Sequence, residues 1–162
     1  MTEINCSILG DAHVGKTSYI LRHVTGEFHV SPPKSDKTYN LKFATNYGVV
    51  NFNIYDGILD NKTNCVIFMF DLTNKQTLLG VESRIKTVRK QLGVNPILLC
   101  GNKIDLKEIK IKPKEIRKFI VDNKIYYYPI SARSNYNFEK PILYMMRKVL
   151  GNENVTFVEW AL

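Results

Sequence analysis

Short apolar runs alternate with amphipathic stretches along the chain, and this alternation predicts an α/β fold with a mostly parallel sheet. Six runs have the length of strands, and the last four of them are enriched in Val, Ile, Phe and Tyr. They span Ile4–Leu9, Tyr39–Thr45, Val49–Tyr55, Cys65–Asp71, Pro96–Gly101 and Ile125–Ile130. Only Asn46, Tyr47 and Gly48 separate the second run from the third, and so short a turn joins antiparallel neighbours. The pattern therefore predicts a six-stranded mixed sheet.

Four amphipathic stretches predict helices that cover both faces of this sheet. Three are followed by glycine, which commonly ends helices, and one has proline in its first turn. The predicted helices are Lys16–Thr25, Lys75–Leu92, Pro113–Asn123 and Phe138–Leu150. The second helix carries an apolar stripe that should face the sheet, and its bases lie largely off that stripe, at Arg84, Lys86, Arg89 and Lys90. We interpret these bases as a solvated face.

Length and composition predict a single globular domain over residues 1–162, neither fibrous nor disordered. The longest apolar run, from Cys65 to Phe70, is far shorter than the roughly 18 residues of a membrane-spanning helix, and no secretion signal follows Met1. We therefore expect an intracellular, soluble protein. Its 3 cysteines lie in or beside apolar runs, which favours buried thiols. A net charge of +8 favours an acidic ligand or partner.

The residues that follow the first strand match a phosphate-binding pattern. The run from Gly10 to Thr17 fits G-x-x-x-x-G-K-[ST] and leads into a predicted helix, as that pattern requires. Backbone N–H groups of such a loop point at phosphates, its Lys neutralises their charge and its Thr hydroxyl ligates Mg²⁺. His13 occupies a position where a positive φ would strain a side chain, so we interpret it as tolerated rather than catalytic. The predicted nucleotide-binding residues here are Gly10, Asp11, Ala12, His13, Val14, Gly15, Lys16, Thr17 and Ser18.

Polar residues at three further strand ends predict the base and metal contacts, because ligands bind at this edge of open α/β sheets. The run Asn102, Lys103, Ile104, Asp105 ends in a carboxylate that can accept from the adjacent N1–H and N2–H₂ of guanine, a pair that adenine lacks. The run Ser131, Ala132, Arg133 follows the sixth strand and offers a backbone N–H to the guanine oxygen. Asp56 closes the third strand and could hold Mg²⁺ through water, although a simple turn at Asp56 and Gly57 is the alternative.

Together these residues resemble the Ras-like small GTPases and, among them, the Ran family of nuclear transport. The resemblance covers nearly the whole chain and is most specific in Arg22–Phe28, Met69–Thr73, Leu99–Leu106 and Ser131–Pro141. It implies a Ras-like P-loop NTPase fold that binds GTP or GDP with Mg²⁺. It also implies that Phe28 packs against the guanine, that Lys103 lies along the base and that Ala132 supplies the N–H.

Two departures from that family fall at its switch segments. Residues 57–64 are roughly three helical turns too short, so the Gly that meets the γ-phosphate and the catalytic Gln have no counterpart and no catalytic residue is assigned. Asp60 could replace that Gln only by accident. The segment between Phe28 and the second strand is slightly short and contains a Pro-Pro pair. Ser35 and Thr38 are both candidates for its Mg²⁺-binding hydroxyl, and the alternative that neither reaches the metal stays open.

The sequence therefore predicts a slow small GTPase that resembles Ran, with a non-hydrolysing Ran mimic that binds or sequesters transport partners as the alternative. A P-loop ATPase or kinase is disfavoured by Asp105 and by the absence of an acidic or Arg-rich lid. The resemblance implies importin-type transport receptors or Ran regulators as partners, and a location in the nucleus and cytoplasm. We expect a monomer without a membrane anchor, and no DNA or RNA partner, because we interpret the basic segment 103–124 as containing a solvated helix that faces a protein partner.

Overall fold

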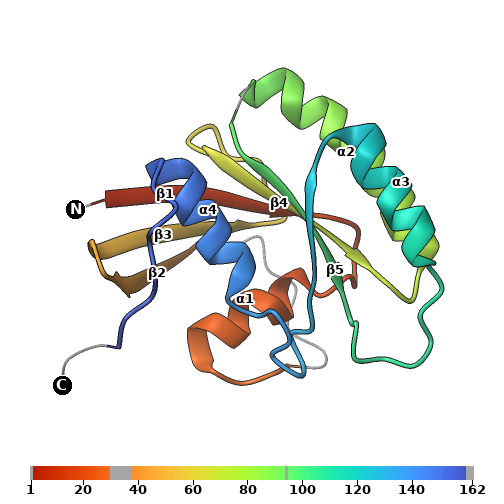
Figure 1. Ribbon diagram of the computed structural model, residues 1–162, viewed down its shortest axis with the longest axis horizontal. Helices are drawn as coiled ribbons and strands as arrows, with labels where there is room; N and C mark the ends of the chain where they lie inside the picture. The colour runs from red at the N-terminus through yellow and green to blue at the C-terminus, as the bar shows by residue number, and fades with distance from the viewer. Residues whose placement is uncertain (1, 30–37, 94, 160–162) are drawn as a thin grey trace.

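A six-stranded sheet forms the centre of the computed structural model, which describes residues 2–29, 38–93 and 95–159. The strand order is β2-β3-β1-β4-β5-β6, with β2 and β3 antiparallel and the other neighbouring pairs parallel (Figure 1). The predicted mixed sheet and its hairpin are therefore confirmed. In chain order the elements are β1 (Thr2–Leu9), α1 (Lys16–Thr25), β2 (Thr38–Thr45), β3 (Gly48–Asp56), β4 (Cys65–Asp71), α2 (Lys75–Leu92), β5 (Ile97–Asn102), α3 (Pro113–Asn123), β6 (Tyr126–Pro129) and α4 (Lys140–Leu150).

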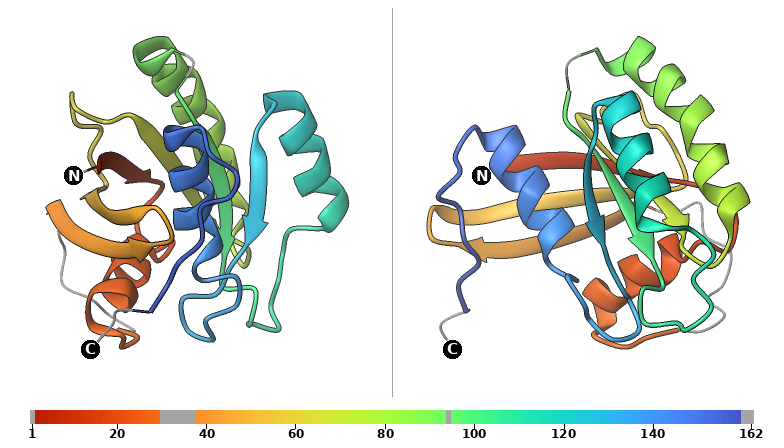
Figure 2. Two further views of the ribbon diagram at one scale, coloured as in Figure 1. Left: turned by 60° about the vertical axis from the view of Figure 1, so that its left-hand side comes forward. Right: turned by 45° about the vertical axis from the view of Figure 1, so that its right-hand side comes forward.

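Helices cover both faces of the sheet, as predicted. Helices α1 and α4 lie on one face and α2 and α3 on the other (Figure 2). Every residue of β4 is buried, and its successive side chains alternate between the two cores: Ile67 packs with the α1 and α4 side, and Phe68 with the α2 and α3 side. A strand that is covered on both faces has a continuous apolar sequence, which explains why β4 could be predicted from the sequence.

The predicted boundaries of the strands and helices differ from those in the structure by at most two residues at either end. Helix α4 begins at Lys140 rather than at Phe138, because Asn135 and Asn137 adopt positive φ values of 65° and 52° and keep the chain in turns up to the helix. Strand β6 is shorter than the predicted Ile125–Ile130 and covers Tyr126–Pro129. Asparagine commonly adopts the left-handed conformation in turns, so Asn135 and Asn137 indicate a turn that the pattern of apolar residues alone does not predict.

The cysteines and the apolar content of the helices bear on two of the expectations drawn from composition. Cys6, Cys65 and Cys100 all lie in the described part of the chain, where they are buried and free, so the prediction of buried thiols is confirmed. Within residues 2–29, 38–93 and 95–159, no helix combines the length and the apolar content that crossing a membrane requires.

Candidate nucleotide-binding site

The phosphate loop, residues 10–17, connects β1 to α1 and has the form of an anion cradle. Lys16 lies over this loop, where its Nζ donates to the carbonyl oxygens of Gly10 and Asp11, both at 2.8 Å. Gly15 has a φ of 102°, and a Cβ there would lie 2.2 Å from Nδ2 of Asn102, so only glycine fits. No side chain of the described residues caps the start of α1. The first N–H groups of that helix are therefore suited to an anionic ligand.

The remaining predicted residues of the loop differ in exposure. Ala12 and His13 are exposed, whereas Val14 is fully buried. His13 has a φ of 66°, so the left-handed conformation expected at this position is confirmed. Ser18 is buried inside α1, and its hydroxyl donates to the carbonyl oxygen of His29 at 2.8 Å. Ser18 thereby ties the helix to the segment that follows Phe28.

Two oxygen ligands suited to Mg²⁺ meet at the end of the phosphate loop. The hydroxyl of Thr17 donates to Oδ2 of Asp56 at 2.5 Å, and Asp56 is only 1% exposed. Mg²⁺ prefers hydroxyl, carboxylate and water oxygens, so this donor set fits the metal. Thr38 begins β2 opposite Tyr55 and is exposed, and Ser35 lies outside the described residues. Their metal roles stay predictions.

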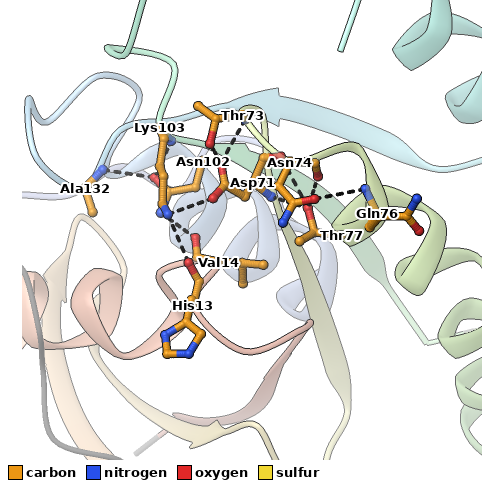
Figure 3. A network of polar contacts seen from close by, with 10 residues as sticks. All are labelled: His13, Val14, Asp71, Thr73, Asn74, Gln76, Thr77, Asn102, Lys103 and Ala132. Atoms are coloured by element: carbon orange, nitrogen blue, oxygen red, sulfur yellow. Dashed lines mark hydrogen bonds and ion pairs between the residues drawn. The ribbon is translucent and has the colours of Figure 1, made fainter. Parts of the chain in front are cut away.

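Asn102 joins the phosphate loop to the predicted base-binding residues (Figure 3). Its Nδ2 donates to the carbonyl oxygen of Val14 at 3.0 Å. Its Oδ1 accepts from the backbone N–H groups of Lys103, at 2.8 Å, and Ala132, at 3.3 Å. Asn102 is 3% exposed and connects three segments of the chain. The N–H of Ala132, which the resemblance assigns to the guanine oxygen, here makes a long bond to Asn102, and its role toward a base stays a prediction.

Lys103 is held by two groups from other segments. Its Nζ donates to the carbonyl oxygen of His13 at 3.0 Å and pairs with Oδ2 of Asp71 at 2.7 Å (Figure 3). The other carboxylate oxygen of Asp71 accepts from the N–H and the hydroxyl of Thr73, at 2.8 and 2.6 Å. Sequence reasoning missed Asp71 as a site residue. Its signal was an acidic residue at the end of a fully apolar strand, at the edge where ligands bind.

Asp105 is exposed but is fixed in place. The buried hydroxyl of Ser131 donates to Oδ1 of Asp105 at 2.7 Å and accepts from the N–H of Ser134 at 3.0 Å. A carboxylate held in this way is oriented before any ligand arrives, which lowers the entropic cost of binding. Arg133 is exposed. The structure thus brings Asp105 and Ser131 together as the sequence predicted.

Helix α1 supports the loop that carries Ser131 and Ala132. The hydroxyl of Tyr19 donates to the carbonyl oxygen of Phe138 at 2.9 Å, and Nε of Arg22 donates to Oδ1 of Asn135 at 2.9 Å. The ring of His23 stacks on Phe138 with their centroids 3.9 Å apart. Burial lowers the pKa of His23 to about 4, so this imidazole is neutral near pH 7. Phe28 is half-buried and packs against the same core.

The connecting segment, residues 57–64, is entirely described and contains no helix, so the prediction that it is too short for one is confirmed. The N–H of Gly57 donates to the carbonyl oxygen of Ile8 at 2.9 Å. Oδ1 of Asp60 accepts from the N–H of Lys62 at 2.8 Å, which closes a local turn. The segment is therefore tied to the sheet and to itself.

The solvated face predicted for α2 is confirmed at Lys86 and Lys90 but not at Arg84 and Arg89. Lys86 and Lys90 are exposed as expected, and Arg89 is half-buried with a bond to the carbonyl oxygen of Lys124 at 3.1 Å. Arg84, however, pairs with Asp11 of the phosphate loop at 2.5 Å. The helical pattern places Arg84 beside the apolar stripe, but it does not predict that the phosphate loop lies close enough to pair with the Arg84 side chain.

Comparison of the chain with models of protein families matches residues 5–151 to the family described as the Ras family. The matched stretch begins in β1 and ends just after α4. It therefore contains the phosphate loop, Asp56, and the residues around Asn102 and Ser131 that form the site.

Proposed function

The chain belongs to the Ras family of small GTP-binding proteins, and from this membership we propose that it binds GTP and GDP with Mg²⁺ at the site described above. The observation that carries the proposal is the set of three bonds made by Asn102. These bonds bring the phosphate loop, the end of β5 and the segment after β6 together. A nucleotide needs both a phosphate cradle and a base pocket, and one buried amide links the residues that fit each role.

Lys16, Thr17 and Asp56 bind the phosphates and the metal in this proposal. Thr17 and Asp56 hold Mg²⁺, which when bound neutralises part of the phosphate charge. Burial is the main cause that lowers the pKa of Lys16, and the negative charge of Asp56 opposes it. A partly buried ammonium interacts more strongly with phosphate than a fully solvated one.

Asp105 selects guanine over adenine, because its carboxylate pairs with two adjacent donors of guanine and would stay unsatisfied against adenine. Ser131 holds that carboxylate at 2.7 Å. Lys103 and Phe28 lie along the base in this proposal. The bonds of the Lys103 Nζ to His13 and Asp71 support this role, since they hold its ammonium between the phosphate loop and the end of β4.

The test of this function is the identity of the nucleotide that the protein carries. Nucleotide released from the purified protein and separated by chromatography should be GTP or GDP. The stripped protein should then bind GTP at least a hundredfold more tightly than ATP in a fluorescence titration. Equal affinity for the two triphosphates would overturn the proposal of guanine specificity.

The resemblance to Ran extends this proposal to nuclear transport. The protein acts in the nucleus and cytoplasm as a monomer, and its partners are importin-type receptors or Ran regulators rather than DNA or RNA. A second candidate function is a non-hydrolysing Ran mimic that binds or sequesters such partners. It is supported by the connecting segment, which lacks the helix and the Gln that the family uses for hydrolysis.

Partner binding should depend little on the nucleotide state. A ligand shifts an equilibrium between two states only if its affinity for them differs. The connecting segment has no helix, so it offers a partner few contacts that would differ between the GDP-bound and GTP-bound forms. Contacts would instead involve retained surfaces and exposed bases of the α3 region, which are Lys110, Lys112, Lys114, Arg117 and Lys118. Such exposed charges are screened beyond about 8 Å at physiological ionic strength, so added salt should weaken binding.

Titration of a labelled importin against the GDP form and the GTP-analogue form measures this dependence. The paired substitution Lys112→Glu and Lys114→Glu should weaken binding to both forms. Lys86→Glu with Lys90→Glu on the exposed side of α2 is the matched control and should have no effect. A hundredfold preference for the GTP form, about 2.7 kcal/mol, would instead reveal a working switch.

A further inference from the structure

An ion pair joins α2 to the phosphate loop at a point of close approach. Nη1 of Arg84 lies 2.5 Å from Oδ1 of Asp11 and donates to the carbonyl oxygen of Gly80 at 3.2 Å. A Cβ on Gly80 would lie only 2.7 and 2.8 Å from the carboxylate oxygens of Asp11. The carboxylate of Asp11 therefore lies directly against the surface of α2 at Gly80, next to Arg84. Glycine inside a helix is unfavourable relative to alanine.

Arg84 and Lys16 contact the same residue from two sides. The Nζ of Lys16 donates to the carbonyl oxygen of Asp11 at 2.8 Å, and Arg84 holds the carboxylate of Asp11. The pKa of Lys16 is lowered first by burial and further by the positive charge of Arg84. Two cations therefore lie close together at the end of the phosphate loop, with one carboxylate to compensate Arg84.

A hollow of about 360 Å³ opens beside this ion pair, with Gly10, Gly57, Leu59, Arg84 and Val88 among the residues that line it. It adjoins the phosphate site, because a Cβ on Gly57 would lie 3.8 Å from Cε of Lys16. The connecting segment runs past this hollow without a helix. Arg84 therefore borders open space that it shares with Gly10 of the phosphate loop and with Gly57, which lies close to Lys16.

We propose that Arg84 determines the preference between nucleoside triphosphate and diphosphate by leaving Asp11 and contacting the γ-phosphate of the triphosphate. This inference rests on the proposed nucleotide binding at the site. The side chains of Arg84 and Asp11 are 38% and 34% exposed, and ion pairs of such exposure contribute little to stability. The γ-phosphate, which only the triphosphate has, carries more charge than a carboxylate and can accept two guanidinium bonds at once. It therefore competes with Asp11, whereas a diphosphate leaves the ion pair intact.

Substitutions of the two partners should change the preference in opposite directions. Arg84→Gln removes the contact with the terminal phosphate and should lower the preference for a GTP analogue over GDP about tenfold. Asp11→Asn removes the competing carboxylate and should raise that preference several-fold. An ion pair that only braced α2 against the loop would give the same change for both nucleotides, and the two substitutions would act in the same direction.

The experiment compares dissociation constants for GDP and a non-hydrolysable GTP analogue, each with Mg²⁺, on protein stripped of nucleotide. Arg84→Lys should retain part of the preference, because lysine offers a charge without the paired donors. Arg89→Gln is the matched control on the same helix, since Arg89 bonds to Lys124 at the other end of α2. Thermal unfolding of each variant verifies that it is folded.

The outcomes separate this inference from the proposed function. If the unsubstituted protein binds GDP and Arg84→Gln changes both dissociation constants equally or not at all, the inference is wrong and the proposed function stands. If the unsubstituted protein binds no guanine nucleotide, the proposed function is wrong. Calorimetric titration with pyrophosphate and tripolyphosphate then decides the inference. Arg84→Gln should weaken tripolyphosphate binding more than pyrophosphate binding, and absent or equal effects would overturn it.

Discussion

Replacing Asp105 with Asn should reverse the base preference from guanine to xanthine, with a change on the order of a hundredfold for each nucleotide. The carboxylate accepts from N1–H and N2–H₂ of guanine, whereas an amide can accept from N1–H and donate to the C2 carbonyl of xanthine. Ser131 donates to Oδ1 of Asp105 at 2.7 Å and can donate to an amide oxygen in the same way. The substituted side chain should therefore keep its orientation.

Competition titrations with GTP, xanthosine triphosphate and ATP measure this reversal. Asp122→Asn is the matched control, because Asp122 is an exposed carboxylate on α3 that pairs with Lys118. It should leave the order of affinities unchanged. An Asp105→Asn variant that still prefers guanine would show that the backbone around Ala132 determines the base specificity, and that Asp105 does not.

Intrinsic GTP hydrolysis should be slower than about 10⁻⁴ s⁻¹, and an activating protein should add little to it. Small GTPases reach roughly a 10⁵-fold acceleration with an activating protein, which requires a residue that orients the attacking water. The connecting segment, described in full, provides no such Gln, and the N–H of Gly57 is bonded to Ile8. Asp60 accepts the bond that closes its own turn. An inserted arginine can stabilise charge but does not place a water molecule.

Single-turnover hydrolysis of labelled GTP, followed with and without an activating protein, provides the measurement. A small GTPase with an intact second switch serves as the control under the same conditions. A rate at or above about 10⁻⁴ s⁻¹ would mean that another residue orients the water. In that case the hypothesis that the protein is a non-hydrolysing mimic would be wrong.

The parts of the site that could be read from the sequence are those encoded by neighbouring residues. The phosphate loop depends on glycines, Lys16 and Thr17 at fixed spacing within one turn and the start of one helix. Strand β4 is apolar throughout because it is buried on both faces. The motifs at Asn102 and Ser131 follow strands, and the geometry of a parallel sheet brings such strand ends to one edge.

The contacts that position these motifs depend on residues far apart in the chain. Lys103 meets Asp71 across 32 positions, and Arg84 meets Asp11 across 73. Arg84 alone is consistent with a solvated surface position, and in both cases the partner is set by how the elements pack. Gly80 looks unfavourable within α2 until the carboxylate of Asp11 is placed beside it. Local patterns therefore specified the strands, the helices and the binding motifs. Packing of the helices and loops on the sheet specified which charged residues form pairs, because side-chain pairing depends on distances between segments that no local pattern contains.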